Sequence, residues 1–176
     1  MKATGVVRRI DDLGRIVVPK EIRKTMRIKE GEKLEIFTDS DSIILKKYSA
    51  LGKINDYASD ITESIYNMLK KNVFITDTDT IISISGPLKK KYINKKISYE
   101  LINYIKKRES KIEYEISNLE IIDGIYEKGS YIISPINSNG DINGLIVILS
   151  DEEEIKEIDE KIIKVISNFL SKQIED

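Results

Sequence analysis

Short β-branched runs alternate with turn residues over about the first 50 positions. The stretches "TGVVRRI" and "GRIVVP" are two such runs, separated by "DDLG", whose Asp and Gly residues favour a turn. Pro19 ends the second run because it cannot donate to a strand ladder, and it suits the first turn of a helix. We expect Gly14 to take a positive φ in the first turn. Farther along, "KLEIFTD" and "SIILKKY" pair through "DSDS" as a second hairpin, after a turn at Gly31.

A helical pattern begins after "YSALGKIND", where we place a boundary between a domain at residues 1–53 and one at residues 54–176. Apolar residues then recur in alternate steps of four and three, as in a coiled-coil seam. The seam consists of Ile54, Ala58, Ile61, Ile65 and Met68, with Tyr57 and Leu69 beside it. This spacing predicts a helix with a broad apolar face.

The middle of the second domain has the pattern of short strands and a helix. "NVFITDTDTIISIS" predicts two strands joined by the turn "DTDT", and "SYELINYIKKR" predicts a short helix with Leu101, Ile102 and Ile105 inward. "KIEYEIS" alternates as a half-buried strand. "SYIISPI" and "INGLIVIL" predict two more strands around the turn "NSNGD".

The C-terminal stretch "EEIKEIDEKIIKVISNFLSKQI" predicts a helix with two apolar stripes. One stripe holds Ile155, Ile158, Ile162, Val165 and Phe169, and the other holds Ile163, Ile166, Leu170 and Ile174. One stripe can cover the sheet and the other can meet the first helix or a partner chain. A single wide core face is the alternative interpretation. Helices with excess apolar face at both ends of a domain are typical parts of a four-helix dimer contact.

Charge changes this picture because it differs between the two halves. The whole chain has a net charge of −1, yet residues 1–53 carry 13 Lys and Arg against 8 Asp and Glu, while residues 54–176 carry 16 against 22. A basic block on an acidic remainder indicates two domains with different partners, the first of them polyanionic. A chance difference between two small domains is the alternative.

The absent residue types limit the chemistry. The chain has no Cys and no His, which excludes disulfides, thiol nucleophiles, zinc-finger ligand sets and histidine acid–base catalysis. We therefore expect no enzymatic activity, no cofactor and no metal, although the carboxylates of the chain still allow acid–base catalysis or a Mg²⁺ site. The longest apolar run, "LIVIL", is far shorter than the roughly 20 residues of a membrane span. The start of the chain lacks the apolar region of a signal peptide, so we expect a cytoplasmic protein without membrane contact.

Arginine is concentrated in one N-terminal segment. Residues 8–28 hold five of the six arginines of the chain, on predicted strand, turn and helix. On the predicted helix, Lys20, Arg23, Lys24 and Arg27 form one continuous stripe. Such an arrangement fits contacts to the phosphates and base edges of duplex DNA. Alternatively, Arg8 and Arg15 pair with acidic residues close in sequence, which are Asp11, Asp12 and Glu21.

A domain of about 50 residues buries little core by itself, so we expect it to be stable as an interleaved pair of copies. Its sequence, and most specifically "DDLGRIVVPKEIRKTM", resembles the N-terminal domain of the AbrB-like transition-state regulators. The resemblance implies an intertwined dimer with a swapped-hairpin β-barrel. It also implies that DNA is contacted by residues at four matching positions, to which we add the neighbouring basic residue Arg9. The predicted DNA-binding residues are Arg8, Arg9, Arg15, Arg23 and Lys24.

The order of elements in the second domain resembles a GAF domain, with "YIISPINSNGDINGLIVILSDEEE" as a weak local match. The predicted fold class is thus α+β, an AbrB-like swapped-hairpin barrel dimer followed by a GAF-like α/β domain. This combination is similar to the family of stage V sporulation regulators. The resemblance implies a sequence-specific transcription regulator, both activator and repressor, of late genes in the forespore. It also implies a nucleoid-associated homotetramer.

GAF folds commonly hold small molecules between the sheet and the short helices, so this part of the domain is a candidate site for an unknown ligand, whose existence the sequence does not decide. Its wall would come from residues 86–105 and "YIISPI", with Tyr92, Tyr99 and Tyr104 available. Asp77 and Asp79 suggest a calcium loop, but the Gly and the distal Glu of an EF-hand are missing, and hairpin-turn residues are the preferred interpretation. The run "DEEE" favours the positive end of the last helix over a metal site.

Two other function classes remain open. AbrB-like heads also occur in antitoxins, which usually carry a short, disordered toxin-binding tail, whereas this chain continues into a patterned domain. A general transition-state regulator with a small-molecule-sensing domain is a variant of the main hypothesis. The ligand-binding enzyme is disfavoured by the absence of His and Cys.

Overall fold

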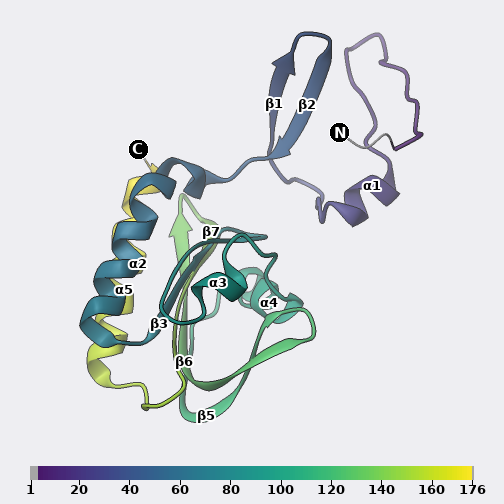
Figure 1. Cartoon of the computed structure of the whole chain (residues 1–176). Coiled ribbons are helices and arrows are strands. Elements are labelled where there is room, and N and C mark those ends of the chain that lie inside the picture. The colour runs from purple at the N-terminus through teal and green to yellow at the C-terminus, as the bar shows by residue number, and fades with distance from the viewer. Residues whose placement is uncertain (1–3, 176) are drawn as a thin grey trace. The chain divides into compact units, whose positions relative to one another are not determined.

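The computed structural model describes the backbone of residues 4–175 and the side chains of residues 4–52 and 57–174. Contacts within the chain divide it into two compact units, Met1–Tyr48 and Ser49–Asp176, which we call the first unit and the second unit (Figure 1). The two units are described separately below.

The first unit has one short helix and one hairpin. Helix α1 spans Lys20–Thr25, and strands β1 (Leu34–Asp39) and β2 (Ser42–Lys47) pair antiparallel. The expected second hairpin is therefore present. Gly14 and Gly31 both have positive φ, at 75° and 77°, as turn glycines do.

The two runs "TGVVRRI" and "GRIVVP" do not form strands in the single chain, which corrects the expectation from their sequence. A turn is present between them, because the amide of Gly14 donates to the carbonyl of Asp11 and the amide of Asp11 donates to the carbonyl of Arg15. A ladder needs a neighbouring strand, and the described part of this unit offers these runs none. A β-branched pattern indicates a preference for a pleated surface, which one copy alone does not provide.

The second unit is a five-stranded antiparallel sheet with helices on both faces (Figure 1). Its strand order is β4-β3-β7-β6-β5. The strands are β3 (Asn72–Thr76), β4 (Ile81–Ser85), β5 (Lys111–Ile122), β6 (Ile125–Ser138) and β7 (Asp141–Ser150). The helices are the 3-10 turn η1 (Ala50–Ile54), α2 (Asn55–Leu69), α3 (Lys89–Tyr92), α4 (Tyr99–Lys107) and α5 (Glu157–Glu175).

The apolar run of β7 is buried on both sides, which explains why it does not alternate with polar residues. Leu145, Val147 and Leu149 belong to a core cluster with α3 and α4, whereas Ile146 and Ile148 belong to a second cluster with α2 and α5. Gly144 lets β3 approach, because a Cβ there would lie 1.9 Å from the carbonyl oxygen of Thr76. The central strand is thus the layer on which both cores are built.

The predicted inward residues of α4 are confirmed. Leu101, Ile102 and Ile105 are buried, and the Ser98 hydroxyl caps the helix by accepting from the amide of Leu101 at 3.1 Å. The turn between β3 and β4 is also confirmed, since Asp77 Oδ1 accepts from the amides of Asp79 and Thr80. These two aspartates therefore occur in the turn that joins the strands.

The two long helices pack on the same sheet face and keep part of their apolar surface exposed. Ala58 and Ile65 of α2 are buried, but Met68 is 61% exposed. The side chain of Ile54, the first residue of the predicted seam, lies outside the described residues. On α5 the stripe with Ile163 and Leu170 covers the sheet, while Ile158, Val165 and Phe169 are exposed. The expectation of one covered and one spare stripe is met, except that Ile155 is itself buried.

A buried ion pair fixes the start of α5. Lys71 Nζ lies 2.5 Å from Asp159 Oδ2, with side chains only 5% and 1% exposed, and it also donates to the carbonyl of Glu154. The same Asp159 oxygen accepts from the amide of Lys156 at 2.7 Å. Removing one partner would leave an uncompensated buried charge.

No described helix is long and apolar enough to cross a membrane.

Candidate nucleic-acid interface

The five predicted DNA-binding residues are all exposed on the first unit. Arg8 and Arg9 lie on the extended segment before the first turn, Arg15 follows the turn, and Arg23 and Lys24 lie in the last turn of α1. A guanidinium offers a planar fork of donors that matches phosphate and base-edge acceptors, whereas an ammonium acts as a point charge. The 17 residues from Arg8 to Lys24 therefore carry six accessible cations, which are these five and Lys20.

Asp11 organises the turn that carries Arg15. Its Oδ1 accepts from the amides of Leu13 and Arg15 at 3.1 and 2.7 Å, and its Oδ2 accepts from Arg15 Nε at 2.8 Å. The pKa of the Asp11 carboxyl is lowered, mainly by the hydrogen bond from the Arg15 amide and then by the one from its guanidinium. The Arg15 side chain remains 72% exposed. Of the three acidic residues that sequence offered as its partner, Asp11 is the one it meets.

Helix α1 is short and has hydrogen bonds at both ends. It begins after Pro19, whose carbonyl accepts from the amide of Arg23 at 2.9 Å. It ends just before Arg27, which has a φ of 55° and whose carbonyl accepts from Lys47 Nζ of β2 at 3.4 Å. Lys47 also pairs with Glu32 at 2.9 Å. These contacts fix the helix that carries Arg23 and Lys24 relative to the hairpin.

An apolar groove of about 380 Å³ lies beside these cations. It is lined from both extended runs, from α1 and from the hairpin, and Arg8 is its one charged lining residue. The other lining residues are Thr4, Val6, Ile16, Val17, Val18, Pro19, Ile22, Met26, Ile28, Leu34, Ile43 and Leu45. We call this surface the head groove. Sequence reasoning did not identify the groove, although the β-branched runs that line it were the signal.

The part of the first unit that the structure describes has no interior of its own. Among its described residues, 4–48, none is buried, and large apolar side chains such as Val7 and Val17 are 86% and 72% exposed. A contiguous apolar surface of this kind marks an interaction site in a soluble protein. A second apolar surface of suitable shape would complete the unit.

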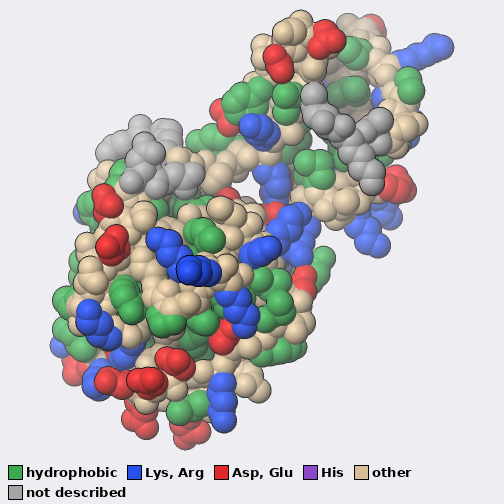
Figure 2. Space-filling view, viewed as in Figure 1, with side chains coloured by type: hydrophobic (Ala, Val, Ile, Leu, Met, Phe, Trp, Pro, Cys, Tyr) green, Lys and Arg blue, Asp and Glu red, His purple; other side chains and the backbone are tan. Residues whose placement is uncertain are grey.

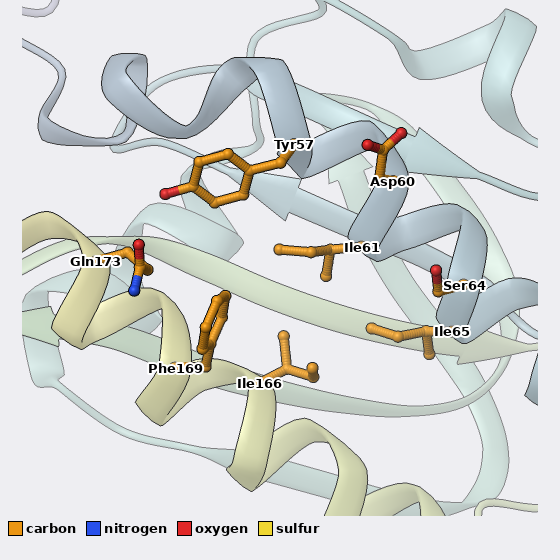
Figure 3. Close-up of a pocket in the computed structure, with 8 residues that line it drawn as sticks. All are labelled: Tyr57, Asp60, Ile61, Ser64, Ile65, Ile166, Phe169 and Gln173. Carbon is orange, nitrogen blue, oxygen red and sulfur yellow. The ribbon is translucent and has the colours of Figure 1, made fainter.

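The second unit has a groove between α2 and α5 with a volume of about 470 Å³. Figure 3 shows Ile61 and Ile65 of α2 and Ile166 and Phe169 of α5 directed toward one another across it. A neighbouring hollow continues along the same helices to Met68 and Val165. We call the combined surface the helix-pair face.

The other side of the sheet, where we expected a ligand, is packed with side chains. Tyr92 is fully buried against Phe74, with ring centroids 6.1 Å apart, and its hydroxyl donates to Glu127. Burial is the main cause of the raised pKa of the Tyr92 hydroxyl. Tyr99 is exposed and Tyr104 lines a separate polar hollow with Lys107. The three tyrosines therefore do not line one cavity. Among the described residues, no group of three or more acidic side chains could hold a metal ion.

Comparison with known proteins decides the family. Residues 53–175 match the model of the stage V sporulation protein T C-terminal domain, described as a transcription factor. The chain is also 45% identical over 177 aligned residues to stage V sporulation protein T of Bacillus subtilis, covering 99% of both chains. The chain belongs to the stage V sporulation protein T family. The predicted combination of domains and the prediction of a sporulation transcription regulator are thereby confirmed.

The two domains of this sporulation family member have further relatives of their own. Residues 7–52 match the model of the MazE antitoxin family. A segment of 48 residues is 56% identical to the transition state regulatory protein AbrB of Bacillus subtilis. The aligned segment covers 27% of this chain and 50% of that protein. The second unit has the fold of the PixJ GAF domain of Thermosynechococcus elongatus, with a TM-score of 0.54 and 12% identity over 73% of this chain and 89% of that one. The AbrB-like and GAF-like assignments are confirmed.

Proposed function

We propose that this chain is a sequence-specific DNA-binding regulator that both activates and represses late, forespore-stage sporulation genes. The observation that carries the proposal is the first unit, which exposes the five predicted DNA-binding cations together with an open apolar groove that Arg8 lines. Its likeness in sequence to AbrB and its place in a family of sporulation transcription factors support the same function. The protein is cytoplasmic, associated with the nucleoid, and acts without enzymatic activity.

In this proposal residues 1–53 are the DNA-binding and dimerisation domain, and two copies interleave as a swapped-hairpin barrel. The runs around Val7 and Val17 would gain ladder partners from the second copy, and the head groove would be covered by apolar side chains of that copy. Burial stabilises by about 25 cal/mol per Å² of apolar surface removed from water, which favours this closure. A two-fold pair also duplicates the cations and so matches the two strands of a duplex.

Direct contacts to DNA are assigned to Arg8, Arg9, Arg15, Arg23 and Lys24. Arg15 is the foremost of these, because Asp11 holds its Nε and the turn backbone together while most of the guanidinium surface stays accessible. Orientation by a carboxylate lowers the entropy that an arginine loses on binding. Phosphate contacts would position the dimer, and arginine contacts to base edges would select the sequence.

Residues 54–176 would join two such dimers into a homotetramer through the helix-pair face. A second copy suits this face because its residues are mostly apolar, with Met68 of α2 and Val165 and Phe169 of α5 exposed. Two helix pairs packed in this way form a four-helix contact. Sensing of an unidentified small molecule by this domain stays a prediction from its GAF-like fold, because the three tyrosines expected to line the site do not share one cavity.

Selection of duplexes from random DNA by the purified full-length protein tests the proposal. We expect one enriched motif with two-fold symmetry and a bound protein mass that is a multiple of the dimer. Recovery of random sequences at low salt only would contradict a sequence-specific regulator.

A second candidate function is that of an antitoxin, which the family match of residues 7–52 supports. Against it stands the folded second unit, which occupies the place where an antitoxin carries its toxin-binding tail. Co-purification of the tagged protein from its own cells separates the two functions. A stoichiometric toxin partner would support the antitoxin, and its absence together with motif-specific DNA binding would support the regulator.

A further inference from the structure

The second unit carries a cluster of lysines that its overall charge does not predict. Residues 89–96 contain five lysines, and no acidic residue occurs between Gly86 and Ser98, although residues 54–176 as a whole carry a net charge of −6. All five lysines are exposed. They are Lys89, Lys90, Lys91, Lys95 and Lys96. In Figure 2 several Lys and Arg side chains gather over the part of this unit where Figure 1 shows α3.

The backbone that carries this cluster is fixed to the core. Tyr92, which follows the first three lysines, and Ile97, which follows the last two, are both fully buried. The amide of Ile81 donates to the carbonyl of Lys95 at 2.9 Å, and the amide of Asn94 donates back to the carbonyl of Ile81 at 3.0 Å. The lysines are therefore displayed from a rigid segment at the edge strand β4, in contrast to a solvated charged tail.

Only part of the positive charge is neutralised within the chain. Lys91 lies 2.6 Å from a carboxylate oxygen of Glu127, and Lys96 lies 3.7 Å from Asp79. Lys89, Lys90 and Lys95 have no ion-pair partner among the residues that the structure describes. Three lysines of this cluster thus remain uncompensated on a unit whose net charge is negative.

The shape of the surface selects an extended polyanion as its partner. The three lysines line none of the cavities described above, whereas a small anionic ligand would need a concave site that removes it from water. Lysine is a compact point charge that suits phosphate groups spaced along a backbone, without reading base identity. A row of phosphates on duplex DNA has this chemistry.

We propose that Lys89, Lys90 and Lys95 form a second, sequence-independent contact surface for duplex DNA beside the motif recognised by the first unit. This inference rests on the proposed DNA-binding function. The second unit would then add phosphate contacts to the affinity of the regulator and require DNA longer than the motif itself. An acidic protein partner and a merely solvated surface are the other outcomes that the following experiment distinguishes.

The test compares two triple variants of the full-length protein with the same loss of charge. The first is Lys89→Gln, Lys90→Gln and Lys95→Gln together, and the control is Lys128→Gln, Lys164→Gln and Lys172→Gln, three exposed lysines elsewhere on the second unit. Fluorescence anisotropy measures Kd from 50 to 200 mM salt on the selected motif alone and on the motif with flanking DNA. Each phosphate contact that is lost lowers the slope of log Kd against log salt by about 0.9.

We expect the first triple variant to reduce this slope by about 2–3 per protomer on the longer duplex and to leave it unchanged on the motif alone. The control should match the wild type on both duplexes. Equal slopes for wild type and both triple variants would overturn the inference while leaving the proposed function intact. Equal reductions in both triple variants would show a net-charge effect and would overturn it too.

A wild-type protein that binds neither duplex would contradict the proposed function, and this inference with it. The three single variants provide a second measurement if the triple variant does not fold. Each should then reduce the slope by about 0.9 on the longer duplex only. Unchanged slopes in all three would overturn the assignment.

Discussion

The two units of this chain bury their apolar side chains to opposite degrees. The second unit packs two clusters on either side of β7, with Ile146, Ile148 and Leu145 fully enclosed. The first unit encloses none of its described residues, although Val6, Ile16 and Val17 share one groove. The second unit therefore has a hydrophobic core built from its own residues. The first unit has the composition of a folded domain, but in the single chain nothing covers its apolar side chains.

This difference indicates how the regulator divides its work. In the proposed dimer, the small first unit would present its cations in two symmetric sets, which would couple its folding to the geometry of DNA recognition. A larger unit with its own core can offer the spare helix-pair face for assembly without losing stability. The most informative experiments are those that act on one unit and leave the other unaltered.

The largest expected effect is on DNA affinity as salt is raised. If the paired first units make roughly 6–10 phosphate contacts, binding should weaken about 10³–10⁵-fold between 50 and 200 mM salt, because neutralised phosphates release counterions. Anisotropy titrations of the full-length protein measure the dissociation constant for DNA at each salt concentration. The melting temperature of the second unit is the control and should barely change with salt. A flat salt response would contradict the electrostatic account.

A matched pair of valine substitutions distinguishes the two apolar surfaces. Val17→Asp in the head groove should raise the dissociation constant of the first-unit dimer about 10²–10⁴-fold, because each of two buried valines contributes roughly 1.5–3 kcal/mol. Val165→Asp on the helix-pair face should leave that dimer intact and remove the tetramer. Both side chains are mostly exposed in the single chain, at 72% and 65%.

Sedimentation of the two variants reads out both effects. Without a partner copy, substitutions at such exposed positions change the free energy of unfolding by no more than about 0.5 kcal/mol. Identical masses for wild type and both variants would therefore show that neither surface is an interface.

Arg15→Ala should remove most specific DNA binding and leave the dimer folded. Loss of one arginine contact to a base typically costs about 1–3 kcal/mol of binding free energy, and a symmetric dimer loses it twice. The competing view is that the pair with Asp11 serves the fold. A lowered melting temperature or a monomeric Arg15→Ala, with affinity falling only as a consequence, would favour that view.

The smallest expected effect concerns the same turn at low pH. Because the pKa of Asp11 is lowered in the folded chain, its contribution to stability is present above its unfolded value of about 3.8 and is lost as pH falls through the folded pKa. Asp11→Asn should therefore melt slightly below the wild type at neutral pH, and the two curves should converge in strong acid. If the melting temperatures of the wild type and Asp11→Asn differ by the same amount at every pH, ionised Asp11 is not the source of this stabilisation.

Elements with local signals were predictable from the sequence. The helix with Leu101, Ile102 and Ile105 and the turn after β3 follow from apolar spacing and from an Asp that caps its own turn. The double burial of β7 could be anticipated from its uninterrupted apolar run. In each of these cases the residues that satisfy the pattern lie in the same chain.

Features that depend on a second copy, on turn geometry or on packing between elements could not be predicted. The run around Val17 has strand composition, but a ladder requires a neighbour that its sequence does not specify. The choice of Asp11 among three nearby acidic residues depends on the turn geometry at Gly14. The burial of Tyr92 likewise depends on how α3 packs against the sheet.

The central claim is that the first unit is completed by a second copy and binds DNA in that form. Light scattering of the fragment 1–53, alone and with the selected duplex, tests it most directly. We predict a dimeric mass for the free fragment, two fragments on each duplex, and weaker binding than the full-length protein shows, because linked heads share an effective concentration. A monomeric fragment that binds the duplex with the affinity of the full-length protein would contradict the account.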